Sequence, residues 1–218
     1  GRRSLIGRLG RSVCVASRAA APAGTGAPDP GAGTVRFMSV YLPTHFRAPD
    51  PVIRDRLAAQ VIAAHPFATL VSVRDGEPFI THCPVTLQAD AAGAPVLEGH
   101  MARANPHWQA WQAGQDRVLV IFQGPQAYVS PTLYEHPENV PTWNYVVVHV
   151  RGRATLTTDS LPGKDALLKR LIAHVEPAYA EHWRGLSPDY QHRMLGAIVG
   201  FVIPVEQIEA KFKVSQNR

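Results

Sequence analysis

The stretch ATLVSVRDGEPFITHCPVTLQ, residues 68–88, decides the fold class of this chain. Two runs rich in β-branched and aromatic residues, Ala68–Val73 and Glu77–Gln88, flank the turn pair Asp75-Gly76. An Asp-Gly pair between two such runs is typical of a tight β-hairpin, because Asp and Gly tolerate the positive φ angles that the turn needs. The stretch therefore predicts two adjacent antiparallel strands.

Outward from this hairpin, the sequence predicts a mainly β domain with a few helices. Further strands are expected at Pro95–Met101, Val118–Gly124, Ala127–Ser130, Trp143–Thr158 and Gly200–Val205. Helices are expected from Asp50 to His65-Pro66 and near Asn105–Ala113, Gly163–His174 and Pro188–Ile198. In the first helix Asp50 can act as the cap, and Pro51 fits the first helical position. Six or more antiparallel strands with peripheral helices favour a closed barrel.

Length and composition favour one domain preceded by a leader. A chain of 218 residues with 45% hydrophobic residues is long enough to bury one substantial core. Residues 1–37 contain no Met and a Pro/Gly/Ala run from Ala19 to Gly33, so they bury too little surface to offset the entropy of ordering. Met38 is the first Met. We expect residues 1–37 to be a disordered leader upstream of the natural start, with a transit peptide as the alternative, and residues 38–218 to form the domain.

The excess of basic residues is concentrated in this leader. The chain holds 22 Lys and Arg against 17 Asp and Glu, and residues 1–37 contain six of the arginines and one aspartate. The remaining 16 basic and 16 acidic residues make the body formally neutral. Nonspecific DNA binding needs clustered Lys and Arg that release counterions from phosphates, and the span Glu176–Pro188 is too long for a helix-turn-helix turn. Any DNA binding is therefore expected from the leader rather than from the body.

Several classes of site have no support in the sequence. The two cysteines, Cys14 and Cys83, make neither a disulfide framework nor a CxxC metal site, so a reducing cytoplasm is the default location. No HExxH, GxSxG, GxGxxG or Walker motif occurs. No stretch approaches the roughly 20 apolar residues that span a bilayer. We expect a cytoplasmic protein with no metal site and no membrane segment.

The first segment that could carry chemistry lies in the second strand of the hairpin. Thr81 and His82 stand just ahead of Pro84, which cannot donate a hydrogen bond to a sheet and so marks an edge or a bulge. Such a break opens backbone groups to a ligand, and hydroxyl and imidazole groups suit the heteroatom rim of a flavin. The alternative is a histidine that only satisfies local hydrogen bonds in the barrel.

The second segment is LEGHMARANPHW, residues 97–108. A strand ends near His100, and Asn105 followed by Pro106 forms a good helix start. Arg103 lies immediately before that start, so the corner has the groups that hold an anion such as a phosphate. In the alternative interpretation Arg103 pairs with a surface carboxylate, Asn105 only caps the helix, and Trp108 belongs to the core.

The third segment is the long apolar strand VPTWNYVVVHVRG, residues 140–152. Trp143 and His149 fall on one face and Val148 on the other, and both faces are largely apolar. One face can fill the barrel while the other meets a second subunit or a planar ligand. The C-terminal cluster Lys211–Arg218 is polar, and fraying is expected there.

Seven segments, in order along residues 38–218, resemble the PaiB family of FMN-binding negative transcriptional regulators: MSVYLPTHF, FITHCPV, LEGHMARANPHW, YVSPTLY, VPTWNYVVVHVRG, IVGFVIPV and KFKVSQNR. The resemblance implies a mainly β fold, a six-stranded antiparallel FMN-binding split barrel with peripheral helices. It also implies a homodimer with FMN at the subunit interface and a regulatory or sensing role. The alternatives are a flavin-dependent oxidoreductase, since a flavin supplies redox chemistry, and a haem-binding split barrel with a histidine as axial ligand.

The resemblance also implies a set of cofactor-binding residues. They are Thr81, His82, Pro84, Val85, Gly99, His100, Ala102, Arg103, Asn105, Trp108, Lys213, Ser215, Gln216 and Asn217. In this set His100, Arg103 and Asn105 hold the phosphate. The first four residues line the flavin ring, and the last four approach from the partner chain.

Overall fold

Residues 40–136, 138–157 and 160–216 are described by the structure, a computed structural model. The leader 1–37 and the predicted site residue Asn217 lie outside these ranges. In chain order the elements are the 3-10 helix η1 (Thr44–Phe46), α1 (Pro51–Ala64), β1 (Phe67–Arg74), β2 (Glu77–Ala89), β3 (Pro95–Ala102), α2 (His107–Gln112), β4 (Arg117–Val129), η2 (Pro131–Leu133), β5 (Thr142–Arg153), β6 (Thr155–Leu156), α3 (Leu161–Val175), α4 (Tyr179–Gly185), α5 (Pro188–Gly196), β7 (Ile198–Pro204) and β8 (Gln207–Lys213).

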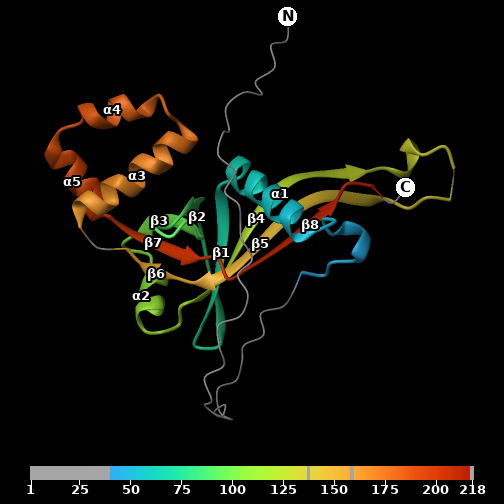
Figure 1. Ribbon diagram of the computed structural model, residues 1–218, viewed down its shortest axis with the longest axis horizontal. Helices are drawn as coiled ribbons and strands as arrows, with labels where there is room; N and C mark the ends of the chain where they lie inside the picture. Colours follow the sequence, from blue (N-terminus) through green and yellow to red (C-terminus); the bar gives the residue numbers. More distant parts are fainter. Residues whose placement is uncertain (1–39, 137, 158–159, 217–218) are drawn as a thin grey trace, which may run out of the picture.

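The strands form one antiparallel sheet in the order β6-β7-β3-β2-β1-β4-β5-β8 (Figure 1). The predicted hairpin is confirmed: Arg74 pairs with Glu77, and the turn residues Asp75 and Gly76 have φ angles of 53° and 86°. The mainly β fold class is also confirmed. The sheet nevertheless has eight strands rather than the six expected.

The extra strands come from two places where the sequence pattern is weak. Residues 142–156 divide into β5 and the short β6, and the polar C-terminal segment forms β8 instead of fraying from Lys211 onward. In β8 the buried Ile208 and Ala210 alternate with polar residues, and Lys213 pairs with Tyr145 of β5. A strand with only one buried face and several charged residues has no clear signal in sequence. Pairing with β5 therefore decides that this segment forms a strand.

The sheet curls without closing through hydrogen bonds, which corrects the expectation of a closed barrel. Among the described strands, β6 and β8 are the two edges. The ends of β5 and β7 meet by packing instead. They approach so closely that a Cβ atom at Gly152 would lie 2.2 Å from the carbonyl oxygen of Pro204. Only glycine permits so close an approach of two backbones.

The core fills the concave side of the sheet. Strand residues such as Leu70 and Phe122 are fully buried there, and α1 adds Ala58 and Ile62 from its position against β2, β4, β5 and β8 (Figure 1). Asp50 caps α1 as predicted, since its Oδ1 atom accepts a hydrogen bond of 2.8 Å from the backbone N–H of Ile53. None of the helices in the described part of the chain has the length and apolar character that a bilayer crossing requires.

Helices α3, α4 and α5 form a helical unit inserted between β6 and β7, at one end of the sheet (Figure 1). It has a small core of its own around Ile172, Trp183 and Leu195. Helix α4 lies inside the span 176–188, for which the sequence predicts only a connection between two helices. A helix of seven residues is too short to be stable alone, so the burial of Trp183 stabilises it.

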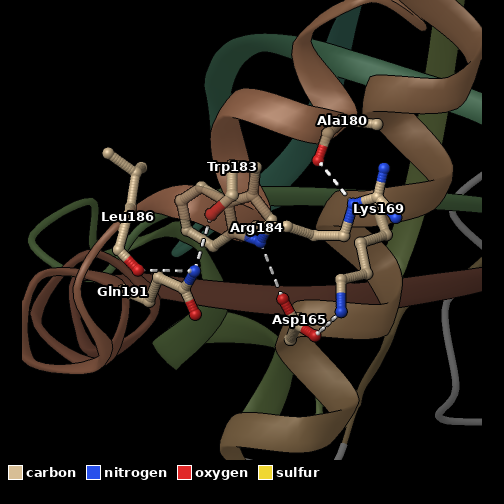
Figure 2. A network of polar contacts seen from close by, with 7 residues as sticks. All are labelled: Asp165, Lys169, Ala180, Trp183, Arg184, Leu186 and Gln191. Carbon is tan, nitrogen blue, oxygen red and sulfur yellow. Dashed lines mark hydrogen bonds and ion pairs between the residues drawn. The ribbon is translucent and has the colours of Figure 1, made fainter.

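A polar network joins these three helices (Figure 2). Asp165 of α3 accepts a hydrogen bond of 2.9 Å from Nε1 of Trp183 and pairs with Lys169 at 2.6 Å. Gln191 of α5 donates to the carbonyl oxygens of Trp183 and Leu186, at 2.6 and 3.3 Å. Burial alone would raise the pKa of Asp165, but the hydrogen bonds from Lys169 and Trp183 and the charge of Lys169 lower it below 3.8.

The substitution Asp165→Asn is expected to lower the free energy of unfolding by about 1 kcal/mol at neutral pH, a modest value because Lys169 is half exposed. A carboxyl whose pKa is lowered by folding stabilises the folded state above its unfolded pKa. That stabilisation is lost as the pH falls through the folded pKa. Urea unfolding of both proteins should therefore show a difference that disappears well below pH 3.8. A difference that persists unchanged well below pH 3.8 would contradict the assignment.

Candidate functional site

The candidate site lies where β2 and β3 diverge. Strand β2 pairs with β1 up to Pro84, and it pairs with β3 only from Val85 onward. Strand β3 pairs with β7 along its other edge, and His100–Ala102 of β3 have no partner on β2, which leaves the edge of β2 at Thr81–Pro84 open on that side. Pro84 therefore marks the strand break that the sequence predicts. A cavity of about 580 Å³ lies at this opening. Its lining residues are Thr81, His82, Cys83, Pro84, His100, Met101, Ala102, Asn105, Leu168, Met194, Ala197 and Ile198.

The polar side of this cavity is a small hydrogen-bonded network. Oγ1 of the buried Thr81 lies 3.0 Å from Nδ2 of Asn105 and 2.8 Å from Nδ1 of His107. Asn105 also accepts a hydrogen bond of 3.0 Å from the backbone N–H of His107, although α2 begins one residue later than expected, with Pro106 in the cap position. Thr81 and Asn105 were predicted from the sequence, whereas His107 was not.

His100 lines the same cavity and has an unsatisfied ring nitrogen. Its Nδ1 atom is buried and has no hydrogen-bond partner among the described residues. Burial lowers the pKa of His100 below its ordinary 6.5, so the ring is neutral at neutral pH. A buried imidazole nitrogen without a partner costs free energy, which a ligand with a matching polar atom would recover.

The opposite wall of the cavity is apolar and comes from the helical unit. Leu168 of α3 and Met194 of α5 line it, together with Ala197 and Ile198 at the start of β7. No local pattern connects these residues with Thr81, which lies more than 80 positions earlier in the chain. Sequence reasoning missed them because only the packing of α3 and α5 beside β3 brings them to the site.

Arg103 holds this wall in place rather than lining the cavity. Its Nε atom donates to the carbonyl oxygen of Gly196 at 2.9 Å, and its backbone N–H donates to that of Ala197 at 2.8 Å. A further hydrogen bond of 3.4 Å reaches the carbonyl oxygen of Ile198. Trp108 in turn donates from Nε1 to the carbonyl oxygen of Arg103 at 2.9 Å. Arg103 thus fixes the junction of α5 and β7, whose residues face the cavity.

Other predicted residues near the site have mainly structural contacts. Val85 is fully buried in the core, and a Cβ atom at Gly99 would lie 2.6 Å from the ring of Phe201. His82 is exposed, with Nδ1 at 3.0 Å from Oγ1 of Thr69 on the neighbouring strand. Burial raises the pKa of the neighbouring Cys83 thiol to about 12, so this sulfur stays protonated.

The predicted C-terminal residues lie elsewhere in the same chain. Lys213 bonds to Oγ1 of Thr142, and Ser215 donates to Oδ1 of Asn144 at 3.0 Å. Gln216 donates to the carbonyl oxygen of His45 at 3.0 Å. These residues lie at and after the end of β8, on the side of the sheet away from β3 (Figure 1), and none of them lines the cavity.

The chemistry of the lining fits a planar heteroaromatic ring better than a phosphate. Its polar atoms come from Thr81, Asn105 and His100 on one side, and its other wall is apolar. Among the described residues that line it, none is a Lys or an Arg. The described residues also contain no group of three His, Cys, Asp or Glu side chains placed to hold a metal ion. A phosphate bound in this cavity would need cationic groups from outside the described lining.

The comparison with known families agrees with this chemistry. Residues 40–207 match the model of the family described as "Putative FMN-binding domain". The chain belongs to this FMN-binding family. It is also 37% identical over 185 residues to the protease synthase and sporulation protein PAI 2 of Bacillus subtilis, which covers 82% of this chain and 83% of the relative. The resemblance to the PaiB family is therefore confirmed, and FMN is the cofactor of the family.

Solved structures show that the fold of this family member is the flavin-binding split barrel. The flavocytochrome Anf3 of Azotobacter vinelandii superposes with a TM-score of 0.56 at 16% identity, over 74% of this chain and 68% of its own. The FAD and heme binding protein of Mycobacterium smegmatis superposes with a TM-score of 0.51 at 19% identity, over 73% and 71% of the two chains.

Proposed function

We propose that this protein binds FMN with the isoalloxazine ring in the cavity between β2 and β3, and that it has a regulatory or sensing role in the cytoplasm. The lining of the cavity carries the proposal, because a space of ring size has the polar residues Thr81, His100 and Asn105 and an apolar wall from the helical unit. Thr81 and Asn105 would contact the polar rim of the ring, and Leu168 and Met194 its apolar face. When bound, FMN supplies one- and two-electron redox chemistry.

The proposal includes a homodimer that completes the phosphate site. Phe67 and Ile80, on the outward face of the β1–β2 hairpin, are 68% and 54% exposed. On the long β4–β5 hairpin the ring pair of Tyr128 and Trp143 is also half exposed, with centroids 5.8 Å apart. Monomers rarely expose apolar patches of this extent, so a second copy is the natural cover. Its C-terminal residues 213–217 would then bring Lys213 toward the phosphate, as the family resemblance implies.

A regulatory role is favoured over an oxidoreductase because the family resemblance implies it. Thr81 and Asn105 bond to each other and to His107, and Cys83 carries a protonated thiol. The FMN-loaded protein mixed with reduced nicotinamide under anaerobic conditions is expected to keep its flavin absorption. Rapid bleaching with turnover would instead show a flavin-dependent oxidoreductase.

Titration of the protein with FMN, followed by flavin fluorescence, tests the binding site. Arg103→Ala is expected to weaken FMN binding about tenfold, because the carbonyl groups of Gly196 and Ile198 lose the guanidinium that fixes the cavity wall. The matched control is Arg193→Ala on α5, whose exposed guanidinium lies over the ring of Tyr190. Equal FMN affinities of the two variants would show that Arg103 does not contribute to the binding site.

A further inference from the structure

The buried His107 lies directly behind the polar rim of the cavity. Its side chain is 0% exposed, and its Nδ1 atom lies 2.8 Å from Oγ1 of Thr81. The rings of Phe79 and Trp111 pack against it, with centroids 4.8 and 4.7 Å from its own. Nε2 is buried too and has no hydrogen-bond partner in the part of the chain that the structure describes. Thr81 is therefore the side chain through which this imidazole acts on the cavity.

Asn105 fixes which hydrogen-bonding positions remain on Thr81. Oδ1 of Asn105 accepts from the backbone N–H of His107 at 3.0 Å, so the amide is oriented with Nδ2 toward Thr81. Nδ2 then donates to Oγ1 and uses one of its two lone pairs. One lone pair and one hydrogen of the hydroxyl are left, to be shared between His107 and the cavity.

The tautomer of His107 decides whether the imidazole uses the remaining lone pair or the hydrogen of the Thr81 hydroxyl. If Nδ1 carries the hydrogen, it donates to the second lone pair, and the Thr81 hydroxyl is free to donate into the cavity. If Nε2 carries the hydrogen, the hydroxyl donates to Nδ1 and has no hydrogen left for a ligand. An acceptor atom in the cavity can therefore satisfy all three positions of the hydroxyl only with the Nδ1–H tautomer.

We infer that His107 is a positioning residue that, as the Nδ1–H tautomer, makes Thr81 a hydrogen-bond donor to an acceptor atom on the rim of the isoalloxazine ring. This inference rests on the proposed binding of FMN in the cavity. The site then selects a ring edge that presents a carbonyl oxygen or an unprotonated nitrogen rather than an N–H group.

The imidazole acts through its tautomer and not through its charge. Burial lowers the pKa of His107 to about 4, well below its ordinary 6.5. The ring is neutral at every pH above that value. FMN affinity is therefore expected to be independent of the ionisation of His107 between pH 6 and pH 8, a range that lies above its pKa of about 4.

Nitrogen NMR of the full chain tests the tautomer directly. Protein with ¹⁵N-labelled histidine is saturated with FMN, and the two ring nitrogens of His107 are assigned with the help of the His107→Asn variant. We expect the shifts of a protonated Nδ1 and an unprotonated Nε2. A protonated Nε2 in the FMN complex would overturn the inference while leaving FMN binding intact. A chain that binds no FMN would overturn both the inference and the proposed function.

A double-mutant cycle tests whether His107 acts through Thr81. His107→Phe and Thr81→Val are each expected to weaken FMN binding about fivefold, as for the loss of one hydrogen bond. The double variant should bind FMN no more weakly than Thr81→Val alone. Once the Thr81 hydroxyl is gone, the loss of His107 has no further effect on FMN binding. Effects that multiply in the double variant would overturn the inference.

Two further variants separate positioning from packing. His107→Asn places an amide donor close to the position of Nδ1 and should recover most of the affinity lost in His107→Phe. Trp111→Phe changes the same ring cluster on α2, but Nε1 of Trp111 donates to Ser72 and not to Thr81. It should lower the melting temperature and leave the absorption maxima of bound FMN unchanged, whereas His107→Phe shifts them. Equal spectra for these two variants would contradict the role of His107.

Discussion

The substitution Gly152→Ala is expected to lower the free energy of unfolding by about 3 kcal/mol, at the upper end of the cost of overpacking. The added Cβ atom would lie 2.2 Å from the carbonyl oxygen of Pro204 and 2.7 Å from Cγ2 of Ile203. The nearest obstacle is backbone, so no side-chain rotation relieves the contact. The ends of β5 and β7 would have to separate, and with them a packed contact that closes this side of the curled sheet.

Gly196→Ala is the matched control for this prediction. Gly196 ends α5, has no heavy atom within 4 Å of its built Cβ and does not have a positive φ. Its substitution should change the free energy of unfolding by only a few tenths of a kcal/mol. Urea unfolding of both variants, with FMN absent, measures the difference. If the two variants were equally stable, the close approach of β5 and β7 would be wrong.

The substitution Arg170→Met is expected to cost about 2–3 kcal/mol, because it leaves a buried carboxylate without its partner. Glu98 of β3 is 8% exposed and accepts two hydrogen bonds from Arg170 of α3, one of them 2.7 Å long from Nε. The hydrogen bond to Glu98 raises the pKa of Arg170 above its ordinary value, against the effect of burial. The arginine side chain is 46% exposed, so solvent screening keeps the cost below that of a fully buried pair.

The double variant Glu98→Met/Arg170→Met tests the origin of this cost. Once the carboxylate is gone, the methionine pair should recover most of the lost free energy of unfolding. Arg170 lies two positions from Leu168, so the single variant should also weaken FMN binding by loosening the cavity wall. A double variant less stable than Arg170→Met would contradict this origin, because neither protein has the ion pair and only the single variant keeps the unpaired carboxylate.

The sequence was most informative where structure is local. Asp75 and Gly76 determine the hairpin turn through their φ angles, and Asp50 determines the start of α1 through one hydrogen bond. Pro84 marks the end of one strand pairing because it has no N–H group to donate. Each of these signals depends on residues within a few positions of one another, so a single sequence contains all the physical information needed.

The charged strand β8 and the short helix α4 carried no such signal. Lys211 and Lys213 resemble a solvated tail, and α4 lies between residues that usually end helices. Both elements are stabilised by partners far away in the chain, β5 for one and the core around Trp183 for the other. Tertiary packing overrides weak local propensity in both cases.

By itself the sequence determined the mainly β fold, the family and the segments that contain Thr81, His100 and Asn105, because turns, caps and ordered motifs depend on neighbouring residues. Only the tertiary structure decided that β2 and β3 part to form the cavity and that α3 and α5 cover it. It also showed that Arg103 bonds to backbone carbonyl groups and that His107 stands behind Thr81. These contacts join groups from separate elements, and their geometry follows from packing that no local pattern encodes.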